Sequence, residues 1–116
     1  MTIAAAIRIT SPDEVRVIEH AAAFARQHSE HCFVISVVPS LPYGNGDEEI
    51  VRANVEAIMR EKCAPLMQEG DDVAQTLLTV ARGFGVRTLF IQSGTTVERL
   101  LTLHPPFDVV VVSNSA

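Results

Sequence analysis

The chain has 116 residues, enough for one domain that buries its own core without disulfides or metal ions. Hydrophobic residues make up 47% and charged residues 20% of the sequence, as in soluble globular proteins, while aromatic residues contribute only 5%. The formal net charge of -5 argues against a nucleic-acid partner or an anionic membrane surface. No apolar run approaches the ~20 residues of a membrane span, and the N-terminus lacks the basic start of a signal peptide. We therefore expect a single cytoplasmic domain over residues 1–116.

Apolar runs and helical patterns alternate from the N-terminus onward. The stretch Thr2–Thr10 predicts a strand, and a helix to about Gln27 follows it. Ser11 and Glu14 have the spacing of a capping box at the start of that helix. The almost uninterrupted apolar run Cys32–Val38 predicts a strand that is covered on both faces.

The middle of the chain combines a loop, a helix and a weak strand. Two prolines and two glycines within residues 39–47 predict the loop. The helix is expected over residues 47–62, with Ile50, Asn54 and Ile58 on one apolar line and Val51, Val55 and Met59 on the next. The segment 64–68 contains Pro65, which lacks a backbone donor, so it predicts at best a short edge strand.

The last third predicts four further elements. They are a helix over residues 73–82, a strand over 86–92, a short helix over 96–103 and a strand over 108–113. Thr95 and Glu98 form a second capping-box pattern before the short helix. The complete alternation of strands and helices predicts an open, mostly parallel, twisted five-stranded sheet with helices on both faces, joined by right-handed crossovers.

Ligands of such sheets bind beyond the carboxyl ends of the strands, where the strand order reverses direction. The candidate ligand-binding residues there are Ile9, Thr10, Ser11, Val38, Pro39, Ser93, Gly94, Thr95 and Thr96. Around Gly94 a turn, the free N–H groups of a helix start and two threonine hydroxyls would suit an anion. Simple capping of the helix by Thr95 would explain the same residues without any ligand.

Other chemical motifs are weak. His28, His31 and Cys32 lack a fourth ligand nearby, so no metal site is expected. No GxSxG, HExxH or GxxxxGKS pattern occurs, and we expect no catalytic residues. The glycines of the sequence GFG (residues 83–85) follow a helix rather than a strand, which is the wrong order for a dinucleotide fingerprint. Cys32 and Cys63 have no CxxC spacing and are expected to be reduced thiols, since a redox pair would require them to meet in space.

Three passages resemble the universal stress protein family, which includes a domain of bacterial potassium-sensing histidine kinases. The passage EGDDVAQTLLTVARGFGVRTLFIQ, residues 69–92, resembles the family's third helix and fourth strand. The passage GTTVERLLTLHPPFDVVVV resembles the family's "G-S-V-A-E-R-V-L" helix and last strand, and the start IRITSPDEVRVIEHAAAFA follows its first strand and helix. The resemblance implies a Rossmann-like fold, similar to the adenine nucleotide alpha hydrolases, with strand order 3-2-1-4-5.

The sequence departs from the ATP-binding members at two positions. Those members resemble one another in a G-x-x-G-(nine residues)-G-[S/T] loop, of which only Gly94 and Thr95 have a counterpart here. The acidic residue that many members carry after the first strand aligns with Ile9, which cannot bind a ribose, an adenine or a metal ion. We therefore expect no cofactor; ATP or AMP remains possible through the residual cleft.

Two functional hypotheses follow. The first is a non-enzymatic regulatory domain that forms a homodimer, with a regulatory protein as a further candidate partner. Its dimer interface would be the Val-rich last strand, as the resemblance implies, with residues Asp108, Val109, Val110, Val111, Val112 and Ser113. The second is a small-ligand binder that takes AMP or an inorganic anion in the truncated cleft near Gly94. An ATP-hydrolysing enzyme is the weakest alternative, because no base or metal ligand is expected at the cleft.

Overall fold

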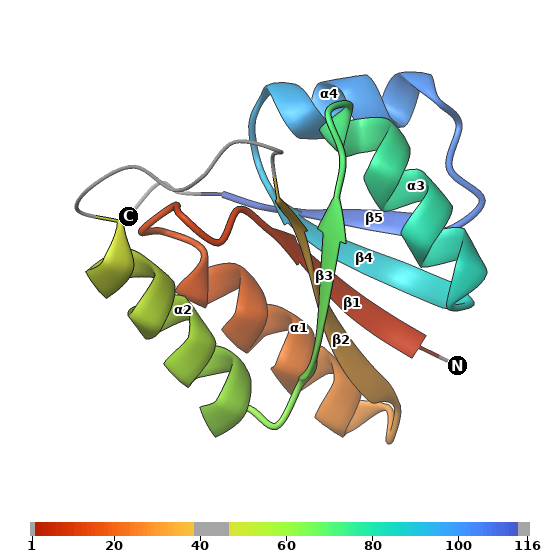
Figure 1. The fold of residues 1–116 in the computed structure, drawn as a ribbon. Coiled ribbons are helices and arrows are strands. Elements are labelled where there is room, and N and C mark those ends of the chain that lie inside the picture. The colour runs from red at the N-terminus through yellow and green to blue at the C-terminus, as the bar shows by residue number, and fades with distance from the viewer. Residues whose placement is uncertain (1, 39–46, 114–116) are drawn as a thin grey trace.

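The computed structural model describes residues 2–38 and 47–113, which form a five-stranded parallel sheet with helices on both faces (Figure 1). The strand order is β3-β2-β1-β4-β5, and every neighbouring pair is parallel. The strands are β1 (Thr2–Ile7), β2 (His31–Val38), β3 (Ala64–Glu69), β4 (Val86–Gln92) and β5 (Asp108–Val112). The helices are α1 (Val15–Gln27), α2 (Glu48–Arg60), α3 (Val73–Gly83) and α4 (Thr95–Thr102). The fold class and the strand order predicted from the sequence are confirmed.

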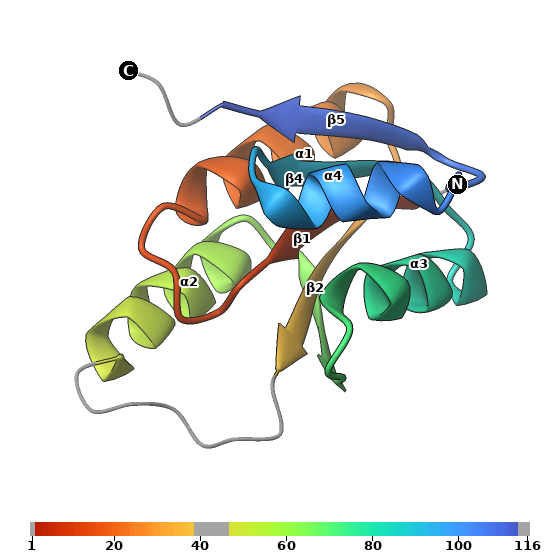
Figure 2. The ribbon, with the colours of Figure 1, turned by 90° about the horizontal axis from the view of Figure 1, so that it is seen from above.

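Two apolar cores lie on opposite faces of the sheet. Helices α1 and α2 cover one face, and α3 and α4 cover the other (Figures 1 and 2). Central strand β1 serves both cores, because Ile3, Ala5 and Ile7 face α1 while Ala4 and Ala6 face α3 and α4. This double burial explains why its sequence is continuously apolar rather than alternating.

The first strand and helix are shorter than predicted, and the predicted capping box of α1 is wrong. Strand β1 ends at Ile7, and the chain turns so that the Ser11 N–H donates to the Arg8 carbonyl at 2.9 Å. Helix α1 begins at Val15, and Glu14 occupies its N-cap position without a side-chain capping bond. Glu14 is instead buried, which places a carboxyl group inside the protein.

The start of α4 also differs from the prediction. Helix α4 begins at Thr95, one residue earlier than expected, and Gly94 occupies the N-cap position without a side-chain capping bond. Thr95 is therefore the first residue of the helix rather than its cap. Gly94 has φ of 155°, a conformation that L side chains rarely adopt, so a glycine suits this turn.

Helix α2 turns only one of its two predicted apolar lines inward. Asn54, Ala57 and Ile58 are buried, whereas Val55 and Met59 are 41% and 71% exposed. Strand β3 is confirmed as an edge strand of the sheet, which tolerates Pro65. None of the helices in the described segments has the length and apolar character that crossing a membrane requires.

Candidate functional site

A cavity of about 70 Å³ lies at the carboxyl end of the sheet, between β1 and β4. From this pair of strands the chain continues to β2 and β3 on one side and to β5 on the other, so this is where the strand order reverses. Open parallel sheets bind their ligands at such a point. The cavity is lined by Ala6, Ile7, Arg8, Glu14, Val73, Leu77, Ile91, Gln92, Ser93, Gly94, Thr95 and Thr96.

The structure brings only part of the predicted residue set to this cavity. Four of the nine candidates line it, namely Ser93, Gly94, Thr95 and Thr96. Ile9, Thr10 and Ser11 do not, because the turn after β1 buries Ile9 in the core of the α1 face. Val38 ends β2, one strand away, but its side chain lies outside the described part of the structure, as does Pro39. Ligand binding by any of these residues stays a prediction.

Two polar residues of the cavity, Arg8 and Glu14, were missed from the sequence, and a third, Gln92, was left out of the candidate ligand-binding residues although it begins the segment that contains four of them. Arg8 and Glu14 belong to the turn that was predicted to be strand and capping box. Gln92 is the last residue of β4, the position after which ligand-binding groups are expected in this kind of sheet, so its place could have been found.

The connection from β4 to α4 consists of two residues, Ser93 and Gly94. The Ser93 N–H donates to the Val112 carbonyl at 3.1 Å, which ties this connection to the end of β5. The Gly94 carbonyl accepts from the Glu98 N–H at 3.3 Å. With both residues held in this way, no loop is present that could wrap around a chain of phosphates.

Glu14 is the most unusual titratable group of the cavity. It is only 2% exposed, and its Oε2 has no hydrogen-bond partner among the described residues. Burial raises the pKa of Glu14 from 4.5 to about 7, although the Arg8 charge, the Arg8 backbone N–H and the Ser11 hydroxyl all act to lower it. The carboxyl group therefore changes its charge close to neutral pH.

A second polar atom of the cavity is also unsatisfied. The side-chain Nε2 of Gln92 is buried and has no hydrogen-bond partner within the described part of the chain. Buried polar groups in native proteins nearly always have a partner, which can be protein, water or ligand. Glu14 and Gln92 both line the cavity, and each has a buried polar atom without a partner among the described residues.

The turn that carries Arg8 and Glu14 is held by Asn54 of α2. Its Nδ2 donates to the Ile9 carbonyl at 2.8 Å and to the Ser11 carbonyl at 3.0 Å. Asn54 is only 1% exposed. The two hydrogen bonds explain why a polar residue lies on the inward face of α2. The bonds position the β1–α1 turn from a helix more than forty residues away in the chain.

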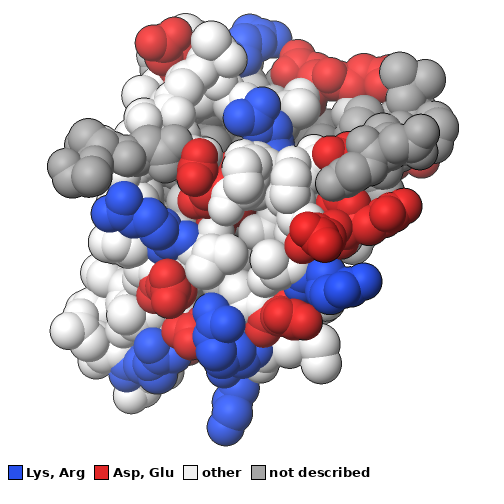
Figure 3. Space-filling model, turned by 90° about the vertical axis from the view of Figure 1, so that its left-hand side faces the viewer, with Lys and Arg blue, Asp and Glu red and all other residues white. Residues whose placement is uncertain are grey.

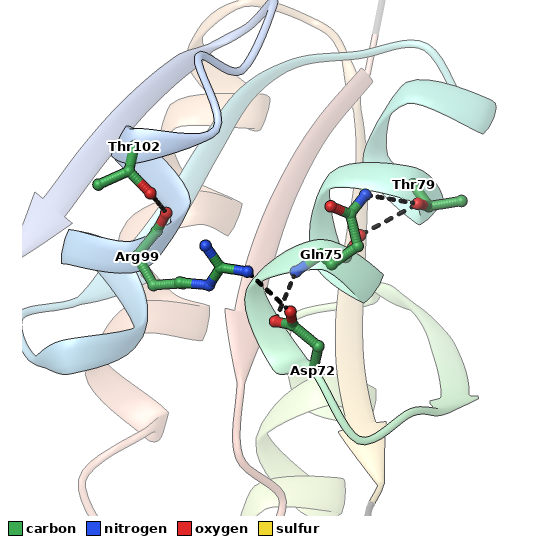
Figure 4. A network of polar contacts seen from close by, with 5 residues as sticks. All are labelled: Asp72, Gln75, Thr79, Arg99 and Thr102. Atoms are coloured by element: carbon green, nitrogen blue, oxygen red, sulfur yellow. Dashed lines mark hydrogen bonds and ion pairs between the residues drawn. The ribbon is translucent and has the colours of Figure 1, made fainter.

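A polar network joins α3 and α4 beside the cavity (Figure 4). Asp72, the N-cap of α3, accepts from the Gln75 N–H at 3.2 Å and from the Arg99 guanidinium of α4 at 3.0 Å. The Arg99 hydrogen bond, helped by the Gln75 N–H, holds the pKa of Asp72 below its usual range. This ion pair links the start of α3 to the last turn of α4, and because both charged side chains are half exposed it contributes little to stability.

On the face that includes α2, acidic and basic side chains are interspersed rather than gathered into a basic surface (Figure 3). Within residues 2–38 and 47–113, no group of three or more His, Cys, Asp and Glu side chains could hold a metal ion. The polar groups that line the cavity are a carboxyl group, a guanidinium, an amide, hydroxyl groups and the N-terminal end of α4.

The fold and the position of the cavity define the class of protein: a doubly wound α/β domain with a cavity at the point where the strand order reverses. No family model and no curated protein sequence matches the chain. Solved structures do match over almost the full length.

The matching structures are universal stress proteins. A universal stress protein family member from Burkholderia pseudomallei is 23% identical with a TM-score of 0.74, over 96% of this chain and 94% of that one. The universal stress protein of Archaeoglobus fulgidus in complex with dAMP is 18% identical with a TM-score of 0.71, over 96% of both chains. A universal stress protein in complex with cAMP is 12% identical with a TM-score of 0.76, over 99% of this chain and 98% of that one. The chain has the universal stress protein fold, and the resemblance seen in the sequence is confirmed at the level of the fold.

Proposed function

We propose that this chain is a non-enzymatic regulatory domain of the universal stress protein type that does not enclose a nucleoside triphosphate and acts as a homodimer. The observation that carries the proposal is the two-residue connection between β4 and α4. A triphosphate at the N-terminus of α4 would find a few helix N–H groups but no enclosing loop. Each charge-assisted hydrogen bond that is missing removes ~1.5–3 kcal/mol of binding free energy, so the loss of several leaves negligible affinity.

Strand β5 supports the homodimer part of the proposal. It is an edge strand, and Val110 and Val111 on its opposite faces are 37% and 46% exposed. An apolar edge with unpaired backbone groups is a template for pairing with another chain. Figure 2 shows β5 at the margin of the sheet, with no described strand beyond it.

Replacing Val111 by Lys is expected to convert the dimer into a monomer, because a charged side chain on an edge strand opposes its pairing with a second chain. The molar mass is measured by light scattering after size-exclusion chromatography at micromolar concentration. Met67→Lys is the matched control, since Met67 is 55% exposed on β3 at the opposite edge of the sheet. A monomeric unmodified protein, or a dimer that only Met67→Lys disrupts, would contradict pairing through β5.

The second candidate function is binding of a small ligand, AMP or an inorganic anion, in the cavity. The unsatisfied atoms of Glu14 and Gln92 favour it, as do the dAMP and cAMP named for two structures with the same fold. The cavity of about 70 Å³ holds several waters or a small anion, whereas pockets for drug-sized ligands span roughly 300–1,000 Å³. Its size therefore favours an inorganic anion over a nucleotide.

Calorimetric titration with phosphate, AMP and ATP separates the two functions. A binding heat with phosphate or AMP but none with ATP supports the ligand-binding function. No binding heat with any of the three supports a regulatory domain that binds none of these ligands. The double variant Thr95→Val and Thr96→Val is expected to weaken phosphate binding about tenfold. It removes two hydroxyl donors while the side chains keep nearly the same shape. Thr102→Val, at the far end of the same helix, is the control and should bind as the unmodified chain does. Tight magnesium-dependent ATP binding would overturn the main proposal.

A further inference from the structure

The two cysteines of the chain meet at the amino-terminal end of the sheet, on the face covered by α1 and α2. The first residue pair between β2 and β3 is Phe33 with Ala64, and Cys32 and Cys63 are the residues directly before it. Cys63 belongs to the apolar core of this face, and Cys32 packs against the same core. Both are free thiols and each shifts the pKa of the other, while the Cys32 thiol donates to the Phe33 carbonyl at 3.9 Å and the Cys63 thiol to the Glu61 carbonyl at 3.8 Å.

The backbone on both sides holds the two cysteines in place. After α2, Lys62 adopts a left-handed conformation with φ of 58°, and the Cys63 N–H donates to the Ile58 carbonyl at 3.0 Å. After α1, Ser29 has φ of 52°, and the Glu30 N–H donates to the Ala25 carbonyl at 2.9 Å. Both are left-handed helix ends with a closing hydrogen bond, and they direct the chain into β2 and β3.

A groove gives small molecules access to this pair. It has a volume of about 550 Å³, and Cys32 is one of its lining residues. Cationic groups of Arg26, Arg60 and Lys62 also line it, together with the carboxylate of Glu61. Arg26 and Glu61 form an ion pair at 3.3 Å across the two helices. The groove lies at the opposite end of the sheet from the cavity near Gly94 and shares no lining residue with it.

The contact between the sulfurs favours loss of one proton from the pair. A hydrogen bond from the Cys32 thiol lowers the pKa of Cys63, although burial opposes this, and the same bond raises the pKa of Cys32. The positive charge of Arg26 acts to lower the pKa of both thiols, whereas the negative charge of Glu61 acts to raise both. The pair therefore loses its proton from Cys63 first, and Cys32 becomes the thiolate only when its own proton passes to the Cys63 sulfur.

We propose that Cys32 and Cys63 form a reversible intramolecular disulfide when a hydroperoxide enters the groove. Adjacent strands lie ~4.7–4.9 Å apart, within the range of ~4.4–6.8 Å that separates the Cα atoms of disulfide-bonded cysteines. Because Cys63 precedes the first paired residue of β3, the sheet does not constrain its exact position. Such a bond would link the edge strand β3 and the end of α2 to β2.

The reaction consumes one hydroperoxide and two thiols. The Cys32 proton moves to the Cys63 sulfur, the Cys32 thiolate so formed attacks the terminal peroxide oxygen, the O–O bond breaks, and the leaving alkoxide or hydroxide takes up a proton, which gives Cys32 sulfenic acid and an alcohol or water. The Cys63 sulfur then attacks the Cys32 sulfur, the S–OH bond breaks, and water leaves with the Cys63 proton. The two sulfurs are oxidised by two electrons in total, and the peroxide is reduced by the same two electrons.

The test treats the fully reduced protein with equimolar hydrogen peroxide, removes the remainder with catalase, unfolds the chain and adds iodoacetamide. The expected result is an intact mass that lacks two hydrogens, no alkylation at either cysteine, and a peptide pair that joins Cys32 to Cys63. Dithiothreitol should restore both alkylation sites. Alkylation of both cysteines after peroxide, covalently linked dimers, or over-oxidised Cys32 without a crosslink would each overturn the proposal.

Two variants test the order of the steps. Cys63→Ser should leave a Cys32 sulfenic acid that dimedone traps, because the second sulfur is missing. Cys32→Ser should show no dimedone adduct at Cys63 under the same conditions, since Cys63 is only 7% exposed. Equal trapping in the two variants would refute the assignment of Cys32 as the attacking sulfur.

Discussion

Replacing Asn54 by Ala is expected to lower the free energy of unfolding by about 3 kcal/mol, because it deprives the Ile9 and Ser11 carbonyls of their donor and leaves a small void. Part of this cost is offset, since the Asn54 Oδ1 has no partner of its own among the described residues. A loss of this size is a large fraction of the roughly 5–15 kcal/mol that stabilises an ordinary domain. Urea unfolding followed by circular dichroism measures it.

Two further variants distinguish the stability that comes from the hydrogen bonds of Asn54 from the stability that comes from the packing of its side chain. Glu56→Ala, at an exposed position of the same helix, is the control and should change the unfolding free energy by less than about 0.5 kcal/mol. Asn54→Asp keeps the shape but replaces the donor by an oxygen, so at neutral pH it should destabilise the protein at least as much as Asn54→Ala. If Asn54→Asp is as stable as the unmodified chain, the bonds to the β1–α1 turn do not hold it.

The same substitution should impair the cavity. Asn54 does not line it, but the turn that it holds carries Arg8 and Glu14 into it. If the cavity binds phosphate, Asn54→Ala is therefore expected to weaken this binding at a temperature where the variant is still folded. An unchanged affinity would show that Arg8 and Glu14 play no part in binding.

Replacing Glu14 by Gln is expected to change how stability depends on pH. Burial raises the pKa of Glu14 from 4.5 to about 7, so the folded state holds this proton more tightly than the unfolded state does. The stabilisation from Glu14 is thus fully present below pH 4.5 and is lost as the pH rises through 7. At about 1.36 kcal/mol for each pKa unit, the loss is on the order of 3 kcal/mol.

The measurement compares the unfolding free energy of the two proteins at several pH values between 4 and 8. Glu14→Gln should be as stable as the unmodified chain at the acidic end and more stable by on the order of 3 kcal/mol at the basic end. Taking the difference cancels the titration of all other groups. Glu56→Gln on α2 controls for the removal of one surface charge. A difference that does not vary with pH would show that the carboxyl group is not held in an apolar environment.

Glu14 also bears on the small-ligand hypothesis. An ionised carboxylate inside the cavity repels an anion, and the guanidinium of Arg8 beside it attracts one, while Asp13 adds a further negative charge nearby. An anion in the cavity therefore favours the protonated form of Glu14. Anion binding should therefore weaken as the pH rises and Glu14 ionises. Sulfate is a suitable probe for measuring this, since its own charge does not change near neutral pH.

The architecture was predictable because parallel sheets leave a strong pattern. Runs such as Cys32–Val38 are apolar at consecutive positions since both sides of the strand are covered. Pro65 marked β3 as an edge strand, and the structure places it there. The missing phosphate loop was also visible, because the residues before Gly94 already had the pattern of a strand. All of these features depend on neighbours in sequence.

The site was only half predictable. The glycine turn and the threonines after β4 were found, since the end of a strand and the start of a helix are local features. Arg8 and Glu14 were missed because Ser11 and Glu14 have the spacing of a capping box, and Arg8 interrupts an otherwise apolar run that continues to Ile9. Asn54 was recognised as a member of the inward face of α2, but nothing near it in the sequence shows that it reaches the Ile9 carbonyl.

The sequence by itself determined the order of strands and helices, the continuous burial of the central strands and the shortness of the β4–α4 connection. These properties follow from hydrophobic periodicity and turn chemistry within a few residues. The tertiary structure alone decided that the chain turns after Ile7, that Glu14 becomes a buried acid beside the cavity, and that Cys32 and Cys63 lie in contact. Each of these depends on which strands are neighbours and on their register, and no local pattern encodes how segments some thirty to forty-five residues apart are aligned.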